Sequence, residues 1–245
     1  MTPRRAPARR SARISARTRR LISSIFDRLD YRSLARIYCD EGGVAFWRDR
    51  RGPAQRLGLA IANALAGRLP PGGRSLYVGA GVAEIPALLI ERHDLGRTVE
   101  PYTLRRAEAR ALNHAGAAAG LKIRGSDAVS ARGTFDHLWI VSVLNDPETL
   151  PSLSALSYGR ADPVTFDSVA FARERTVVRR LVDRCLRRLT VPGLVTTSVE
   201  EVPWIRDWAK RHRRETIVEA EELPTALVGD AVCFVRLERR KKVSG

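Results

Sequence analysis

The 245-residue chain has an ordinary hydrophobic fraction of 44% and a formal net charge of +16 at pH 7. This length suits one α/β domain with an N-terminal extension, and the lack of an apolar run of about 20 residues excludes a membrane-spanning helix, so we expect a soluble, cytoplasmic protein. The three cysteines lie far apart without metal-ligand spacing, which argues against a disulfide framework and predicts no metal site.

Most of the positive charge lies at the two ends of the chain. Residues 1–20 carry eight arginines and no acid, and residues 236–245 carry five basic residues and one acid, which leaves +4 for the span between them. We predict disordered basic tails over residues 1–20 and 241–245. An Arg-rich, acid-poor N-terminus is also typical of a mitochondrial transit peptide or of a tail that contacts nucleic acid or lipid, so these alternatives stay open.

Apolar residues at helical spacing indicate an N-terminal helical extension over residues 21–52. Pro53 is expected to open a further helix that runs to about Leu69, where the turn residues Pro70-Pro71-Gly72-Gly73 end it. Three aromatic side chains of the extension are expected to pack on the domain or to cover a ligand as a lid: Tyr38, Phe46 and Trp47.

A strand, a glycine turn and a helix follow one another over residues 74–86. Gly79 and Gly81 lie in the turn, and Pro86 lies in the first turn of the helix, where its missing N–H costs little. Glycine lets the backbone approach a ligand, and the free N–H groups of the helix start point toward it. This stretch therefore predicts a nucleotide-cofactor cradle.

Two acids occur at the ends of the next two expected strands. The strand over residues 97–101 contains Glu100, which lies 19 residues beyond Gly81, a spacing that places a carboxylate where it can accept both hydroxyl hydrogens of a ribose. After a helix over residues 104–119, a short third strand ends at Asp127.

The run over residues 137–144 is almost wholly apolar, as expected for a central strand covered on both faces, and His137 in it is predicted to be a core residue. Asn145 and Asp146 follow at the strand end, where they would either bind a methyl acceptor or cap a helix. The remaining chain predicts an irregular connection, a helix, a strand, a short helix and two last strands, the final one antiparallel: residues 149–167, 169–189, 194–199, 204–212, 215–219 and 230–237.

This order of parts resembles the class I S-adenosylmethionine-dependent methyltransferases over residues 53–240. The resemblance rests on the glycine turn from Gly79 to Ala83, on Glu100, on Asp127, on the fourth strand and on the turn before the fifth. It implies a Rossmann-like, mostly parallel sheet of seven strands with the last one antiparallel, helices on both faces, and S-adenosylmethionine as cofactor. The implied cofactor-binding residues are Val78, Gly79, Ala80, Gly81, Glu84, Glu100, Pro101, Asp127 and Ala128.

Two residues depart from the family pattern. Ala83 stands where the motif has its third glycine, and Tyr77 stands where the family commonly has an acid that orients the methionine end of the cofactor. A dinucleotide motif fits less well, because its third glycine would fall on Glu84. The resemblance implies methyl transfer to an acceptor, with a small molecule favoured and Asn145 and Asp146 as its candidate partners. The alternative is a non-catalytic relative that binds nucleic acid through its basic tails.

Overall fold

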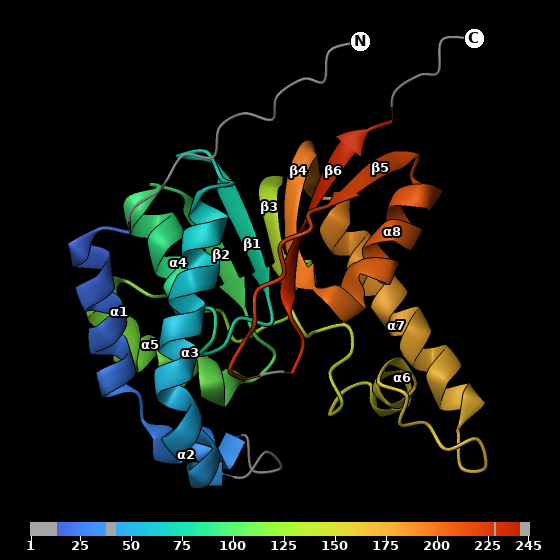
Figure 1. Ribbon diagram of the computed structural model, residues 1–245, viewed down its shortest axis with the longest axis horizontal. Coiled ribbons are helices and arrows are strands. Elements are labelled where there is room, and N and C mark those ends of the chain that lie inside the picture. Colours follow the sequence, from blue (N-terminus) through green and yellow to red (C-terminus); the bar gives the residue numbers. More distant parts are fainter. Residues whose placement is uncertain (1–13, 38–42, 228, 241–245) are drawn as a thin grey trace.

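Six strands form one mixed sheet in the order β2-β1-β3-β4-β6-β5 (Figure 1). The computed structural model describes residues 14–37, 43–227 and 229–240. Strands β1 to β4 pair in parallel, while β6 is antiparallel to both of its neighbours. The expected mostly parallel sheet with an antiparallel last strand is confirmed, and its strands are β1 (Arg74–Val78), β2 (Thr98–Tyr102), β3 (Phe135–Ile140), β4 (Leu189–Ser198), β5 (Arg214–Val218) and β6 (Val232–Arg239).

The sheet has six strands, so the prediction of seven was wrong for the segment ending at Asp127. That segment forms only one isolated parallel bridge, between Arg124 and Tyr102. The Asn113 side chain binds both backbone groups of Ile123, donating to its carbonyl at 2.8 Å and accepting its N–H at 2.7 Å. Because a side chain satisfies these groups, the segment does not need a strand ladder at that point.

Helices cover both faces of the sheet (Figure 1). The first apolar core packs the N-terminal helices on strand residues such as Tyr77 and Trp139, and the second packs the later helices on strand residues such as Leu76 and Leu138. Neighbouring strand residues thus face opposite cores, as strand geometry requires. The first layer contains α1 (Ala16–Arg28), α2 (Tyr31–Ile37), α3 (Gly43–Ala66), α4 (Ile85–Leu89) with its π-helical continuation η2 (Ile90–Asp94), and α5 (Arg106–Gly116) with η3 (Ala117–Ala119).

The second layer contains α6 (Pro151–Ser157), α7 (Ser168–Leu186) and α8 (Val202–Arg211), the last preceded by the single turn η5 (Val199–Glu201). Helix α6 lies within the connection that was expected to be irregular, and the Glu174 carboxylate of α7 accepts the N–H groups of Ser152 and Leu153 at its start. Side chains from the following helix thus cap a short helix that the sequence pattern does not indicate. None of the described helices is long and apolar enough to cross a membrane.

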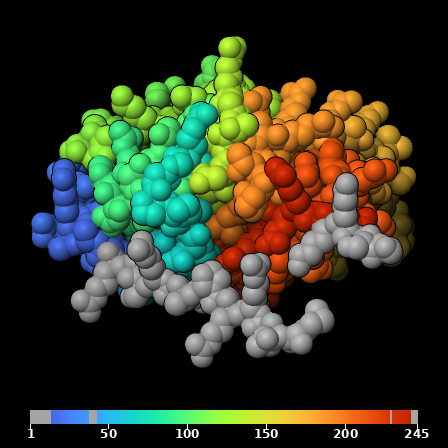
Figure 2. Space-filling view, turned by 90° about the horizontal axis from the view of Figure 1, so that it is seen from above, coloured from blue at the N-terminus to red at the C-terminus, as the bar shows by residue number. Residues whose placement is uncertain are grey.

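Helix α3 runs through Pro53, where the sequence predicted a new helix to begin. Proline removes one helical hydrogen bond, to the carbonyl four residues earlier at Asp49, and Asp49 is exposed to solvent, which can satisfy that carbonyl. The predicted boundary between residues 52 and 53 therefore falls inside a continuous helix. In Figure 2 the cyan part of the chain, which includes α3, lies between the blue N-terminal helices and the red C-terminal strands.

Helix α1 begins at Ala16, inside the stretch predicted to be a disordered tail over residues 1–20. Ile14 is buried, and the Ser15 hydroxyl accepts the Thr18 N–H at 3.1 Å as an N-cap. The hydroxyls of Ser15 and Thr18 also both donate to the Asp94 carboxylate at 2.7 Å. Capping and this tertiary contact order residues 14–20 despite their polar composition, while residues 1–13 and 241–245 of the predicted tails lie outside the described residues.

Removing this cap is expected to destabilise the protein modestly. Ser15→Ala should lower the free energy of unfolding by about 1 kcal/mol, because the Thr18 N–H and the Asp94 carboxylate both lose a partner. Urea denaturation measures the change. Ser168→Ala is the matched control, since that exposed serine follows the Asp167 cap of α7. Equal effects of the two substitutions would show that the Ser15 contacts contribute nothing.

Candidate functional site

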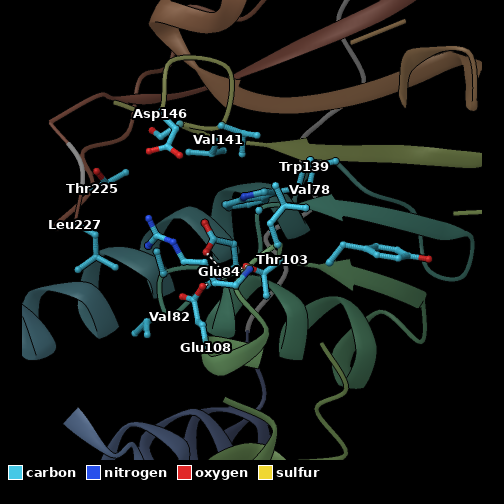
Figure 3. A pocket seen from close by; sticks show the side chains of 18 of the residues that line it. Val78, Val82, Glu84, Thr103, Glu108, Trp139, Val141, Asp146, Thr225 and Leu227 are labelled. Carbon is cyan, nitrogen blue, oxygen red and sulfur yellow. Dashed lines mark hydrogen bonds between the residues drawn. The ribbon is translucent and has the colours of Figure 1, made fainter. Parts of the chain in front are cut away.

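A cavity of about 280 Å³ lies at the carboxyl ends of β1, β2 and β3 (Figure 3). Ligands of open α/β sheets bind at this edge, where loops rather than helices meet the strand ends. The polar and titratable residues that line the cavity come from the glycine turn, from α5 and its preceding loop, from the segment before η4 (Ala128–Ser130), from the loop after β3 and from residue 225: Glu84, Tyr102, Thr103, Arg105, Glu108, Ser126, Asp127, Ser142, Asp146, Thr149 and Thr225.

Gly79 shapes the turn that forms the floor of this cavity. Its φ of +75° is in the left-handed region, and a Cβ added to it would lie 2.5 Å from the Cγ2 of Val143. Both conditions demand glycine. Val78, Gly81, Val82 and Ala83 also line the cavity, whereas Ala80 is buried behind it, with its N–H bonded to the Tyr102 carbonyl at 2.7 Å.

Glu84 projects into the cavity from the residue before α4. It is only 6% exposed, and its Oε2 accepts the Gly81 N–H at 2.8 Å. Burial raises the pKa of this carboxyl to about 7, the negative charge of Glu108 adds to that rise, and the Gly81 hydrogen bond partly offsets it. A titratable carboxyl is therefore held against the glycine turn, as the sequence placed it.

Glu108 is the cavity residue that the sequence analysis missed. It lies in the first turn of α5, is 3% exposed, and accepts a hydrogen bond from the Thr103 hydroxyl at 3.2 Å. Figure 3 shows Glu84, Thr103 and Glu108 close together, on either side of the same space. One signal was present, because Glu108 precedes the buried Leu112 and Ala115 by four and seven residues, so an acid occupies the apolar face of that helix.

Glu100 does not line this cavity, contrary to the ribose-binding role that the sequence spacing suggested, and neither does Pro101. Strand β2 continues to Tyr102, so Glu100 lies two residues, or about 6.6 Å, before the strand end. Its carboxylate pairs instead with Arg74 at 2.5 Å and with Arg124 at 3.1 Å. The acid beside the end of β2 is thus Glu108.

Asp127 and Ala128 both line the cavity, at the far side of the β2 end. Asp127 is exposed and caps the short helix η4, where its Oδ1 accepts the Val129 N–H at 2.9 Å. Ala128 is buried. An apolar contact beside an exposed acid and free backbone groups can bind a flat heterocycle through its edge and one face.

The loop after β3 brings only one of its two candidate residues to the cavity. Asp146 lines it and accepts the Thr149 hydroxyl at 2.8 Å, whereas Asn145 is 1% exposed and does not line it. The buried Glu201 carboxylate holds this loop in place by accepting the N–H groups of Ser142 at 3.0 Å and of Val143 at 2.6 Å. The capping role of Asp146 and a role toward an acceptor are therefore compatible.

Helix α3 and residues 225–227 enclose the cavity with mostly apolar side chains. Phe46 and Trp47 are buried, stand edge to face with ring centroids 5.1 Å apart, and line the cavity, so they act in packing and as a cover together. Tyr38 lies outside the described residues. Within the described ranges, no group of three or more His, Cys, Asp or Glu side chains has a metal-binding arrangement.

Tyr77, at the position where the family commonly has an acid, points away from the cavity. It is fully buried, stacks on Trp139 with ring centroids 5.1 Å apart, and donates its hydroxyl to Glu91 at 2.5 Å. Glu91 also lies 3.0 Å from His137, whose other ring nitrogen is 2.9 Å from the Thr196 hydroxyl. The prediction that His137 is a core residue is confirmed.

Comparison with solved structures identifies the fold. The chain resembles the magnesium protoporphyrin IX methyltransferase of Synechocystis PCC 6803, solved with bound S-adenosylmethionine, at a TM-score of 0.50 and 10% identity, covering 87% of this chain and 98% of that one. It also matches a methyltransferase of Pyrococcus furiosus at a TM-score of 0.48 and 11% identity, covering 74% and 83% of the two chains. No protein-family model and no curated protein matches this sequence.

The chain therefore has the Rossmann-like fold of the class I S-adenosylmethionine-dependent methyltransferases, as the sequence motifs indicated. Its sheet order agrees with that fold once the missing third strand is allowed for.

Proposed function

We propose that this protein is a methyltransferase that binds S-adenosylmethionine in the cavity at the carboxyl ends of β1, β2 and β3. The observation that carries the proposal is the cradle at Gly79, where only glycine fits and where the backbone closes the floor of an enclosed cavity. The fold of the Synechocystis methyltransferase, which was crystallised with this cofactor, supports the same assignment.

The residues present fit this cofactor. Thr103 and Glu108 would bind the ribose hydroxyls beside the end of β2, in place of Glu100. Asp127 and Ala128 would contact the adenine, and Glu84 lies beside the glycine turn, where the methionine end would pass. Glu84 thereby supplies the carboxylate that the substitution at Tyr77 removes from the motif.

Bound S-adenosylmethionine supplies a methyl group on a positively charged sulfur; in the transfer the sulfur–methyl bond breaks and leaves its electron pair on sulfur, the acceptor's lone pair forms the new bond to carbon, and the acceptor's proton passes to a base or water. The protein's part is chiefly to align donor and acceptor and to exclude water. Helix α3 and residues 225–227 provide that exclusion, and Asp146 lies at the rim, where it can accept a proton.

We propose a small, largely apolar molecule as the acceptor. The cover of the cavity is built from side chains that favour such a group over a phosphate backbone, among them Phe46, Leu57, Ile61 and Leu227. The alternative of nucleic-acid binding through the basic tails concerns residues 1–13 and 241–245, which lie outside the described residues, and it stays a prediction.

Direct binding tests the proposal. Isothermal titration calorimetry of the full chain should show one site for S-adenosylmethionine and one for its demethylated product, S-adenosylhomocysteine, and each ligand should raise the melting temperature by mass action. NAD is the control ligand, because Glu84 occupies the position of the third glycine in a dinucleotide motif. Absence of heat and of thermal stabilisation with both adenosyl ligands would refute the proposed function.

A further inference from the structure

The cavity has the opposite sign of charge to the rest of the chain. The chain carries a net charge of +16, yet the cavity lining described above contains four carboxyl groups and one guanidinium. That guanidinium, Arg105, forms an ion pair with Glu148. A pocket of this sign attracts a cation rather than a phosphate or a carboxylate.

Two of these carboxyl groups are buried and face the same space. Glu84 is 6% exposed and Glu108 is 3% exposed, and they reach the cavity from α4 and α5, which flank it (Figure 3). Two carboxylates that interact in a buried site cannot both ionise easily unless a positive charge lies between or beside them. Their mutual repulsion is evident in Glu84, whose pKa is raised by burial and by Glu108.

The other charged groups at the cavity are engaged elsewhere or exposed. Asp127 is exposed and caps η4, Asp146 accepts the Thr149 hydroxyl, and Arg105 pairs with Glu148. Of the elements packed against the pair, the lining residues of α3 and residues 225–227 contribute no charged group, and β2 contributes the Tyr102 phenol. Glu84 and Glu108 are therefore the buried charges that a bound ligand meets.

We propose that Glu84 and Glu108 form a charge-selective pair that holds the positively charged sulfonium cofactor and disfavours the neutral thioether left after methyl transfer. The inference rests on the proposed function and adds to it a means of product release. Methyl transfer removes one positive charge from sulfur, so the pair loses its counter-charge when the reaction is complete. The ammonium group is common to cofactor and product, and hence it does not contribute to the selectivity.

The experiment compares the dissociation constants of S-adenosylmethionine and S-adenosylhomocysteine by calorimetry, for the wild type, Glu84→Gln and Glu108→Gln. An opposite charge within about 4–6 Å changes the equilibrium of a carboxyl by about 1–3 pKa units, so the preference for the sulfonium should fall at least tenfold in each variant. Glutamine keeps an oxygen that can accept the Gly81 N–H or the Thr103 hydroxyl. Glu215→Gln, an exposed residue on the edge strand β5, is the charge-matched control and should not change the preference.

A second readout needs no substitution. The wild-type preference for the sulfonium should be larger at about pH 8 than at about pH 6, because Glu84 gains a proton between these values, and the pH dependence should be absent in Glu84→Gln. Measuring that variant at both pH values removes any contribution from protonation of the ligands. Equal preferences in the wild type and both variants, with no pH dependence, would overturn the charge-selective pair while leaving the proposed function intact. Failure of both ligands to bind the wild type would overturn the two together.

Discussion

Gly79→Ala is expected to weaken S-adenosylmethionine binding at least tenfold, a loss of about 1.4 kcal/mol of binding free energy. The alanine Cβ would lie 2.5 Å from the Cγ2 of Val143, and a β-branched side chain has few rotamers into which it can move. Both residues line the cavity, so Val143 would be displaced into the space that the cofactor needs. Calorimetric titration of the folded variant measures the change.

Two further variants separate the clash from backbone strain. Gly72→Ala has nearly the same φ, +73°, but nothing lies within 4 Å of its added Cβ, so it should cost about 1–2 kcal/mol of stability and leave cofactor affinity unchanged. Val143→Ala in the Gly79→Ala background removes the clashing methyl and leaves the Val143 Cβ at 3.8 Å. Affinity should largely recover in that double variant. Equal affinities of Gly79→Ala and the wild type would contradict the assignment of the glycine turn as the cofactor cradle.

Local sequence patterns predicted those parts of the site that depend on a few consecutive residues. The turn at Gly79 and Gly81 and the pair Asp127 and Ala128 line the cavity as expected, because a strand end followed by a turn fixes their position. Glu100 was misplaced for a different reason. Its distance along the sequence from Gly81 was suitable, but the length of β2 decides which residue reaches the strand end, and Pro101 did not end that strand.

The remaining differences come from tertiary contacts that no short window contains. Glu108 occupies an apolar helix face because the cavity of the folded protein lies there. The segment around Ile123 is not a strand because the distant Asn113 satisfies its backbone. Residues 14–20 are ordered because Asp94, 79 positions beyond Ser15, binds the cap of α1. Each of these is a single side chain whose partner is far away in the sequence.

Tyr77 illustrates how a change in a motif is accommodated. Its ring stacks on Trp139, and its hydroxyl joins a buried polar cluster around Glu91 instead of a ligand. In that cluster Glu91 accepts hydrogen bonds from Ser75, Tyr77 and Arg97, and Arg97 also pairs with Asp136. The cluster connects β1, β3 and η2 beneath the cavity, so the residue at the motif position supports the sheet.

Glu91→Gln is expected to cause the largest loss of stability among the predicted substitutions, about 3–5 kcal/mol at neutral pH. Both side chains of the Glu91–Arg97 pair, 2.9 Å apart, are fully buried, so removing the carboxylate leaves the Arg97 guanidinium poorly compensated in the interior. Asp136 is its other acidic partner, but the Asp136 side chain is 32% exposed and offsets only part of the loss. Urea denaturation measures the change in the free energy of unfolding.

The pH dependence of that loss distinguishes a charged contact from lost packing. Hydrogen bonds and the positive charges of its partners hold the pKa of Glu91 below its usual value despite burial. The unfolded chain therefore binds a proton that the folded protein excludes, so the contribution of Glu91 is fully present above its unfolded pKa, near 4.5, and is lost as the pH falls through the lower folded value. The difference between wild type and Glu91→Gln should thus shrink in acid. Asp207→Asn, which removes an exposed i,i+4 partner of Arg211, should change stability by no more than about 0.5 kcal/mol at any of these pH values, and a Glu91→Gln effect equally small would show that the buried cluster does not stabilise the sheet.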